Sequence, residues 1–112
     1  MKKVYICSPY ASQGIREENV KKAKRYCKAA IDRGCLPIAP HVFYTQILSD
    51  DIEEERAAGL RLGLELLKEC DEIWVFGSAT GGMVNEVQLA KDLGMQVYYI
   101  PENGGEQQWP KA

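Results

Sequence analysis

The stretch 76–86, FGSATGGMVNE, brings small polar residues, three glycines and one carboxylate together. A glycine turn at the start of a helix can bind an anion through its backbone N–H groups. A glutamate in the helix that follows can act as a nucleophile. The Walker A pattern fails because Met83 and Val84 replace the required lysine and hydroxyl residue, and the GxGxxG spacing is absent. The loop Gly77–Gly82 therefore remains a candidate for anion binding by backbone groups alone.

Glu86 is the candidate catalytic residue of this stretch. If Thr80 is the N-cap, Glu86 lies in the second turn of the helix, at the edge of the sheet-facing apolar stripe, which consists of Met83, Val87, Ala90 and Leu93. Burial raises the pKa of a carboxyl group at such a place, whereas the nearby helix N-terminus lowers it. An ionised, poorly solvated carboxylate is well placed to be a nucleophile. The alternative is a boundary glutamate whose side chain extends into water.

His41 is the second candidate catalytic residue, as a general acid or as a hydrogen-bond donor to a ligand. The alternative is that His41 is a loop residue with no functional role.

Tyr10 and Tyr44 are placed to stack on a base or a sugar, or simply to pack. The four cysteines form no CxxC pair, so reduced thiols are expected and a zinc site is not. The acidic run 50–55, DDIEEE, suits the first turn of a helix better than a metal site, and no cofactor is implied.

Alternating strands and helices must position these residues. Apolar runs predict strands at 3–8, 35–40, 71–77 and 96–101, and helical spacing predicts helices at 17–33, 50–70 and 82–93. This order predicts a single three-layer α/β domain over residues 1–101, with a parallel sheet of four to five strands and helices on both faces. The tail 102–112 has no periodicity, and we expect it to be partly mobile.

Several residues predict the place of their segment within this fold. Pro37 and Pro40 predict that the second strand lies at a sheet edge, because proline has no N–H to donate to a neighbouring strand. The uninterrupted apolar run Ile73–Phe76 predicts a central strand that is buried on both faces. Asp50 and Glu53 have the spacing of a capping box at the start of the second long helix.

The carboxyl ends of the strands are where such sheets bind ligands. This rule selects the loops 8–14, 40–44 and 77–82. The candidate substrate-binding residues, from these loops and the start of the helix that follows them, are Ser8, Pro9, Tyr10, Tyr44, Gly77, Ser78, Thr80, Gly81, Gly82 and Met83.

Composition and charge limit the partners. The formal net charge of -2, without a basic stripe, argues against a nucleic acid polymer. No apolar run approaches the ~20 residues of a membrane helix, so we expect no membrane partner. We expect a cytoplasmic location. The helix at 51–70 has apolar residues on more than one face, with Leu60, Leu64 and Leu67 on one stripe. The surplus predicts a second packing partner, such as another copy of the chain in a homo-oligomer.

Three segments together resemble a known group of proteins. VYICSPY (4–10), GCLPIAPHVFYTQIL (34–48) and CDEIWVFGSATGGMVNEVQLA (70–90) are similar to small uncharacterised bacterial and phage domains. These domains form a family of unknown function related to the nucleoside 2-deoxyribosyltransferases and the deoxynucleotide N-hydrolases. The resemblance covers the chain from Val4 to about Pro101 and implies a flavodoxin-like, Rossmann-like fold. It also implies homo-oligomers whose sites are completed by a neighbour.

The resemblance also implies roles for individual residues. Glu86 takes the nucleophile's place: it attacks the anomeric carbon of a deoxyribosyl group, expels the base and forms a covalent glycosyl-enzyme, which water or a second base resolves. Thr80 matches a position that contacts the sugar or its phosphate. Ser8, Pro9 and Tyr10 match the loop after the first strand that lines the pocket.

One position departs from the family's pattern. The enzymes carry a second acidic residue eight positions before the aspartate that opens the central strand; that aspartate is Asp71 here, and the earlier position holds Gly63. His41, Asp50, Asp51 and the glutamates of 53–55 are the candidates to replace the missing acid. Protonation of a leaving group by a general acid typically contributes ~10²–10⁴-fold to the rate.

The sequence therefore predicts an enzyme of nucleoside or nucleotide N-glycosidic bonds, of the deoxyribosyltransferase or N-hydrolase type, with retaining double displacement. A non-catalytic nucleotide-binding module is the alternative, with Glu86 hydrogen-bonded to a ribose hydroxyl. A structural or assembly domain built on the second long helix is a third hypothesis. Gly63 favours the module, and Glu86 near the apolar stripe favours the enzyme.

Overall fold

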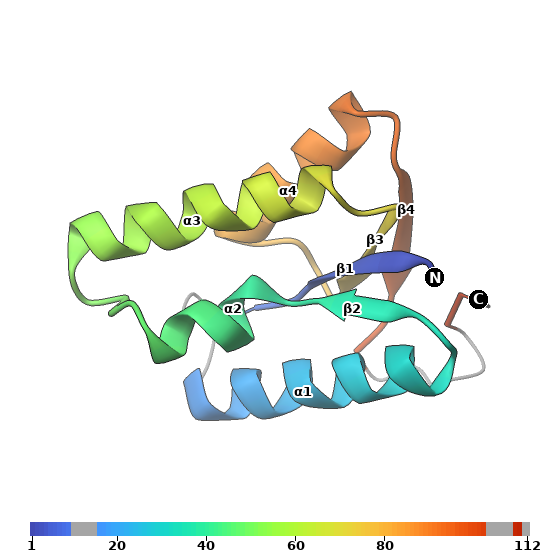
Figure 1. The fold of residues 1–112 in the computed structure, drawn as a ribbon, viewed down its shortest axis with the longest axis horizontal. Coiled ribbons are helices and arrows are strands. Elements are labelled where there is room, and N and C mark those ends of the chain that lie inside the picture. The colour runs from blue at the N-terminus through green and yellow to red at the C-terminus, as the bar shows by residue number, and fades with distance from the viewer. Residues whose placement is uncertain (10–15, 103–108, 111–112) are drawn as a thin grey trace.

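The computed structural model describes residues 1–9, 16–102 and 109–110, in which strands and helices alternate (Figure 1). The elements in chain order are β1 (Lys3–Cys7), α1 (Arg16–Asp32), β2 (Leu36–Ile38), α2 (Pro40–Phe43), the 3-10 helix η1 (Tyr44–Gln46), α3 (Glu53–Lys68), β3 (Glu72–Phe76), α4 (Gly82–Asp92) and β4 (Gln96–Ile100). Every strand and helix expected from the sequence has a counterpart within a few residues of its predicted bounds. The predicted alternation is confirmed.

The four strands form one parallel sheet in the order β2-β1-β3-β4. Strand β2 lies at an edge, as its Pro37 predicts. All residues of β3 are buried, which confirms the prediction of a central strand. Figure 1 shows α1 on one side of the sheet and α3 and α4 on the other. The three-layer, flavodoxin-like α/β fold predicted from the sequence is therefore confirmed.

The face of the sheet under α1 is closed by aromatic rings. Tyr26 of α1 stacks on Phe76 of β3, with ring centroids 3.8 Å apart. The Trp109 ring is tilted against Phe76 and Trp74, at centroid distances of 4.9 and 5.9 Å, and the Arg33 guanidinium lies 5.0 Å from its centroid. Trp109, which belongs to the predicted tail 102–112, therefore packs against the core, where burying part of its ring offsets the entropy lost on ordering the chain.

The opposite face packs against α4. Met83, Val87 and Ala90 are buried there, as predicted from their spacing. The prediction for the fourth residue of that stripe is wrong: Leu93 is 50% exposed. Helix α4 ends at Asp92, so Leu93 is the C-cap and lies beyond the stripe.

Helix α3 lies on the same side of the sheet and buries less than its composition suggests. Leu67 is fully buried, whereas Leu60 and Leu62 are 49% and 39% exposed. The apolar surplus predicted for this helix is therefore present on its surface.

None of the helices in the described part of the chain is both long and apolar enough to span a bilayer.

The predicted N-caps of α3 and α4 are both wrong. Helix α3 begins after Ile52 without a side-chain cap, because Asp50 forms an ion pair with Arg16 of α1 at 3.5 Å. Helix α4 begins after Gly81, again without a side-chain cap. Gly81 has φ of 53°, a backbone conformation that favours glycine. Thr80, one residue earlier, is left outside the helix.

Candidate active site

A cavity of about 220 Å³ opens at the carboxyl ends of the strands, with walls from the end of β1, from α2 and η1, from α3 and from the start of α4. The side chains that bring polar or aromatic chemistry to it include Tyr5, Ser8, His41, Tyr44 and Glu86. Parallel α/β sheets bind ligands at this end of their strands. The cavity is therefore the candidate active site.

Glu86 lines the cavity, half-buried, on the side of α4 that faces β1. The Tyr5 hydroxyl donates a hydrogen bond to Glu86 Oε2, and the Cys7 thiol donates one to Glu86 Oε1 at 3.3 Å. Burial raises the pKa of Glu86, against the opposing effect of these two hydrogen bonds. The carboxylate is therefore poorly solvated but oriented through both oxygens.

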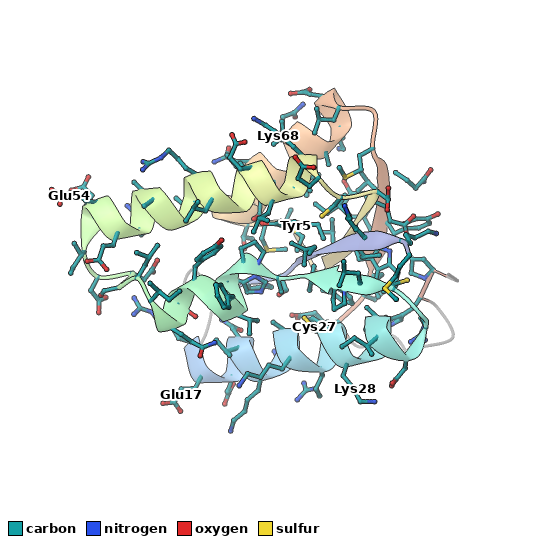
Figure 2. The ribbon with its side chains drawn as sticks, viewed as in Figure 1. Tyr5, Glu17, Cys27, Lys28, Glu54 and Lys68 are labelled. Carbon is teal, nitrogen blue, oxygen red and sulfur yellow. The ribbon has the colours of Figure 1, made fainter. Side chains whose placement is uncertain are left out.

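Tyr5 and Cys7 are the residues of this site that the sequence analysis missed. They are two positions apart on β1, so their side chains project from the same face of the sheet. Figure 2 shows Tyr5 between β1 and α3. Burial, and secondarily the charge of Glu86, raises the pKa of both Tyr5 and Cys7, so both groups keep their protons. Their spacing of two residues could have shown that they share a face of the sheet, but only the packing of α4 against β1 brings that face to Glu86.

His41 and Ser8 form a pair beside the carboxylate. Ser8 Oγ and His41 Nε2 lie 2.9 Å apart, within hydrogen-bond distance. Burial lowers the pKa of His41 to about 4. At neutral pH the imidazole is therefore neutral and can donate or accept a hydrogen bond, which disfavours the predicted role of His41 as an imidazolium general acid.

Gly63 lies in the wall of the cavity opposite Glu86. A β-carbon built on Gly63 would lie 3.2 Å from the Tyr5 hydroxyl oxygen and 3.8 Å from Glu86 Oε2. The position at which the resemblance implies an acid thus lies next to Glu86. In this chain the backbone of α3 occupies that position without a side chain.

Charged residues line the same cavity near the start of α3. They are Asp50, Glu55 and Arg56. Glu55 Oε1 accepts a hydrogen bond from the Ser49 backbone N–H at 2.7 Å, and Asp50 is paired with Arg16. Glu55 and Gly63 are eight residues apart, or about 12 Å along the helix axis. The cavity therefore has an inner end at Glu86 and a charged outer end.

Five of the other predicted substrate-binding residues line one of two hollows. Tyr44, Gly82 and Met83 line the cavity. Gly77 and Ser78 do not; they line a separate hollow with Glu102 and the end of β4.

The remaining predicted residues lie near the loops that the sequence selected. Pro9 is buried after β1, and Gly81 precedes α4. Thr80 Oγ1 is buried and finds no hydrogen-bond partner within the described part of the chain. Tyr10 lies outside the described residues. No group of three or more His, Cys, Asp or Glu side chains within the described ranges could hold a metal ion.

A family model described as "Domain of unknown function (DUF7768)" matches residues 2–100 of the chain. The search of curated proteins found no match to the chain. Among solved structures, the chain is similar to a 2-deoxyribosyltransferase from the psychrotolerant bacterium Bacillus psychrosaccharolyticus. The sequence identity is 20% and the TM-score 0.71, over 92% of this chain and 74% of that chain. At this identity the likeness shows a shared fold.

Proposed function

The chain belongs to the DUF7768 family, and we propose that it is an enzyme that breaks the N-glycosidic bond of a nucleoside or nucleotide, with Glu86 as nucleophile. The observation that carries the proposal is the half-buried Glu86 carboxylate in the cavity, oriented by Tyr5 and Cys7. The fold shared with a 2-deoxyribosyltransferase supports it, as does the sequence resemblance that gives Glu86 the nucleophile's place.

The hydrogen bonds of Glu86 distinguish its two oxygens. Oε2 accepts from the Tyr5 hydroxyl, a good donor, whereas Oε1 accepts from the Cys7 thiol, a weak one. Oε1 is therefore the better nucleophile. It attacks the anomeric carbon, the bond to the base breaks, and a covalent glycosyl-enzyme forms. Water or a second base then attacks the same carbon from the opposite face and returns the electron pair to Glu86.

The other lining residues bind the substrate in this proposal. The neutral His41 and Ser8 offer a donor and an acceptor to sugar hydroxyls. Tyr44 lines the cavity and presents an aromatic surface on which a base can stack. Arg56 lies at the charged outer end, where it can interact with a phosphate if the substrate is a nucleotide.

Gly63 favours a second candidate, a nucleotide-binding module without catalysis, because a general acid beside the nucleophile is missing at this position. In that case Glu86 hydrogen-bonds a ribose hydroxyl. Saturable nucleotide binding without release of base would distinguish the module from the enzyme.

The experiment is a search for base release from 2′-deoxynucleosides, ribonucleosides and their 5′-monophosphates, including derivatives with cationic bases. Glu86→Gln keeps the shape of the side chain and its acceptor for Tyr5, and we expect it to abolish turnover. Glu65→Gln is the matched control, because Glu65 is exposed on α3 and pairs with Lys68. Intact-mass analysis should show a glycosyl adduct on the wild type and on Glu65→Gln. Turnover that survives in Glu86→Gln would exclude Glu86 as the nucleophile.

We also propose that the chain forms a homo-oligomer through α3. Leu62, which is 39% exposed on α3, supports this, because exposed apolar surface is available to a partner copy, whereas Leu60 lines the cavity. Light scattering of the eluted protein should give a multiple of the 12.6 kDa chain mass. Leu62→Glu should reduce that mass, and a wild-type monomer at micromolar concentration would contradict the proposal.

A further inference from the structure

The surroundings of Glu86 determine which leaving groups the site can expel. On the side of α3, the carboxylate faces Gly63, where even a β-carbon would be in van der Waals contact with Oε2 at 3.8 Å. On the side of β1, it faces the Tyr5 hydroxyl and the Cys7 thiol. A neutral purine or pyrimidine normally needs a proton as it departs, so the proton donors of this inner end decide the substrate.

The donors next to the carboxylate are poor acids. Burial raises the pKa of both Tyr5 and Cys7, and both groups already donate their hydrogen to Glu86. His41 is neutral at pH 7, because burial lowers its pKa to about 4. Its Nε2 is also engaged with Ser8. None of these groups combines an available proton with the acidity that a general acid needs.

The other carboxyl groups of the cavity, Asp50 and Glu55, lie at its outer end. Glu55 precedes Gly63 by about 12 Å along α3, and its Oε1 is bound to the Ser49 backbone N–H. Asp50 is paired with Arg16. Figure 2 shows Glu54, in the same first turn of α3, far from Tyr5 along the helix. Within the described ranges, the inner end therefore holds a nucleophile without a neighbouring acid.

The negative charge of Glu86, at the inner end of the cavity, also has no positively charged partner within the described ranges. The ion pairs found within the described part of the chain do not include Glu86. Its two hydrogen-bond donors are neutral groups. A ligand with a positive charge close to the anomeric carbon would supply the missing counter-charge, and the Tyr44 ring in the same cavity suits a cationic aromatic ring.

We infer, on the basis of the proposed function, that the site takes N-glycosides whose base is already cationic, such as pyridinium or N7-alkylpurinium glycosides. Such a base departs as a neutral molecule and needs no proton. Glu86 Oε1 forms a bond to the anomeric carbon, the bond from that carbon to the ring nitrogen breaks, and its electron pair neutralises the ring.

The second half of the reaction also balances without an acid. Water attacks the anomeric carbon, the ester bond to Glu86 breaks with its electron pair returning to the carboxylate, and one proton is released to solvent. A neutral pyridine can replace water. Its nitrogen forms the new glycosidic bond and becomes cationic, so base exchange moves no proton in either direction.

A matched pair of substrates tests the inference. Guanosine and N7-methylguanosine have the same sugar and ring system and differ in a methyl group and a positive charge; their 2′-deoxy forms make a second pair. For each compound, base release with the protein is divided by the uncatalysed rate at the same pH, which removes the intrinsic difference in reactivity. We expect this acceleration to be at least about 100-fold greater for the methylated compounds, since a general acid contributes ~10²–10⁴-fold.

Failure of the inference and failure of the proposed function give different results. A ratio below about 100-fold, with both compounds turned over, would overturn the cationic substrate and leave the N-glycosidic activity standing. No acceleration of any compound, neutral or cationic, would overturn both.

Base exchange gives a second, independent measurement. Deuterated nicotinamide is incubated with unlabelled nicotinamide riboside, and labelled riboside is measured by mass spectrometry. We expect label to enter with the wild type and with Glu65→Gln, but not with Glu86→Gln. Incorporation that is equal with and without the protein would contradict the inference.

Discussion

Removing the Tyr5 hydroxyl tests how the structure sets the properties of Glu86. Tyr5 is 1% exposed, and its hydroxyl donates to Glu86 Oε2. Tyr5→Phe deletes this donor while the ring continues to fill its space. Oε1 keeps the Cys7 thiol at 3.3 Å, a weak donor that does not compensate. We therefore expect the pKa of Glu86 to rise further above its usual range, because this hydrogen bond favours the ionised form.

The magnitude follows from the kind of hydrogen bond that is lost. A hydrogen bond to a charged group contributes about 1.5–3 kcal/mol to stability, against about 1 kcal/mol for a neutral pair. Tyr5→Phe should therefore lower the free energy of unfolding by about 2 kcal/mol at a pH where Glu86 is ionised. With a urea slope of about 2 kcal/mol/M for a small domain, the midpoint falls by ~1 M. In acid, where Glu86 is protonated, the difference shrinks.

Two measurements check this prediction without a substrate. Urea unfolding of both proteins gives the stability difference as a function of pH. The ¹³C shift of the Glu86 carboxyl carbon, assigned by comparison with Glu86→Gln, gives its titration. Tyr99→Phe is the control, because Tyr99 is 57% exposed and lies outside the cavity. An unchanged Glu86 titration in Tyr5→Phe would refute the view that Tyr5 orients and stabilises the carboxylate.

Three further predictions concern Glu86, His41 and Trp109. Because burial raises the pKa of Glu86, the folded state holds this proton to higher pH than the unfolded chain, and stability falls as the pH rises through the folded pKa. Glu86→Gln should therefore raise the unfolding free energy at pH 7 by about 0.5–2 kcal/mol. This gain disappears in acid, and a variant less stable than wild type at pH 7 would contradict it. The His41 ring should titrate near pH 4 by ¹H NMR, and a midpoint near 6.5 would show that it is not desolvated. Trp109→Ala should cost about 2 kcal/mol, roughly half the value for a fully buried tryptophan. Calorimetry checks this, and an unchanged melting temperature would show that the ring contributes nothing to the core.

The fold followed from local patterns because those patterns depend on few distant contacts. Pro37 restricts its strand to an edge whatever the rest of the chain does. The apolar run Ile73–Phe76 can be satisfied only between two covered faces. The predictions of the capping residues were wrong because capping does depend on distant contacts. Asp50 found a partner in Arg16, from another element, and such competition cannot be seen in the spacing of a single helix.

The candidate site was predicted in part. The spacing in α4 placed Glu86 at the edge of the buried stripe, and its half-burial agrees with that placement. The general-acid role predicted for His41 is disfavoured and its role as a hydrogen-bond donor remains a prediction, since the burial that lowers its pKa depends on elements that pack over it. The loop 77–82 was treated as one unit, but Gly82 lines the cavity while Gly77 and Ser78 line another hollow.

The sequence by itself determined the order of the elements, the edge and central strands, and the place of a glutamate in the second turn of the last helix. Each of these depends on residue type and on spacing along a few turns of chain. Only the tertiary structure decided which groups surround that glutamate. Tyr5 reaches it across 81 positions of sequence, and Gly63 faces it from a third element. The pKa and the orientation of Glu86 result from these contacts, because desolvation and hydrogen bonding act through space and leave no trace in local spacing.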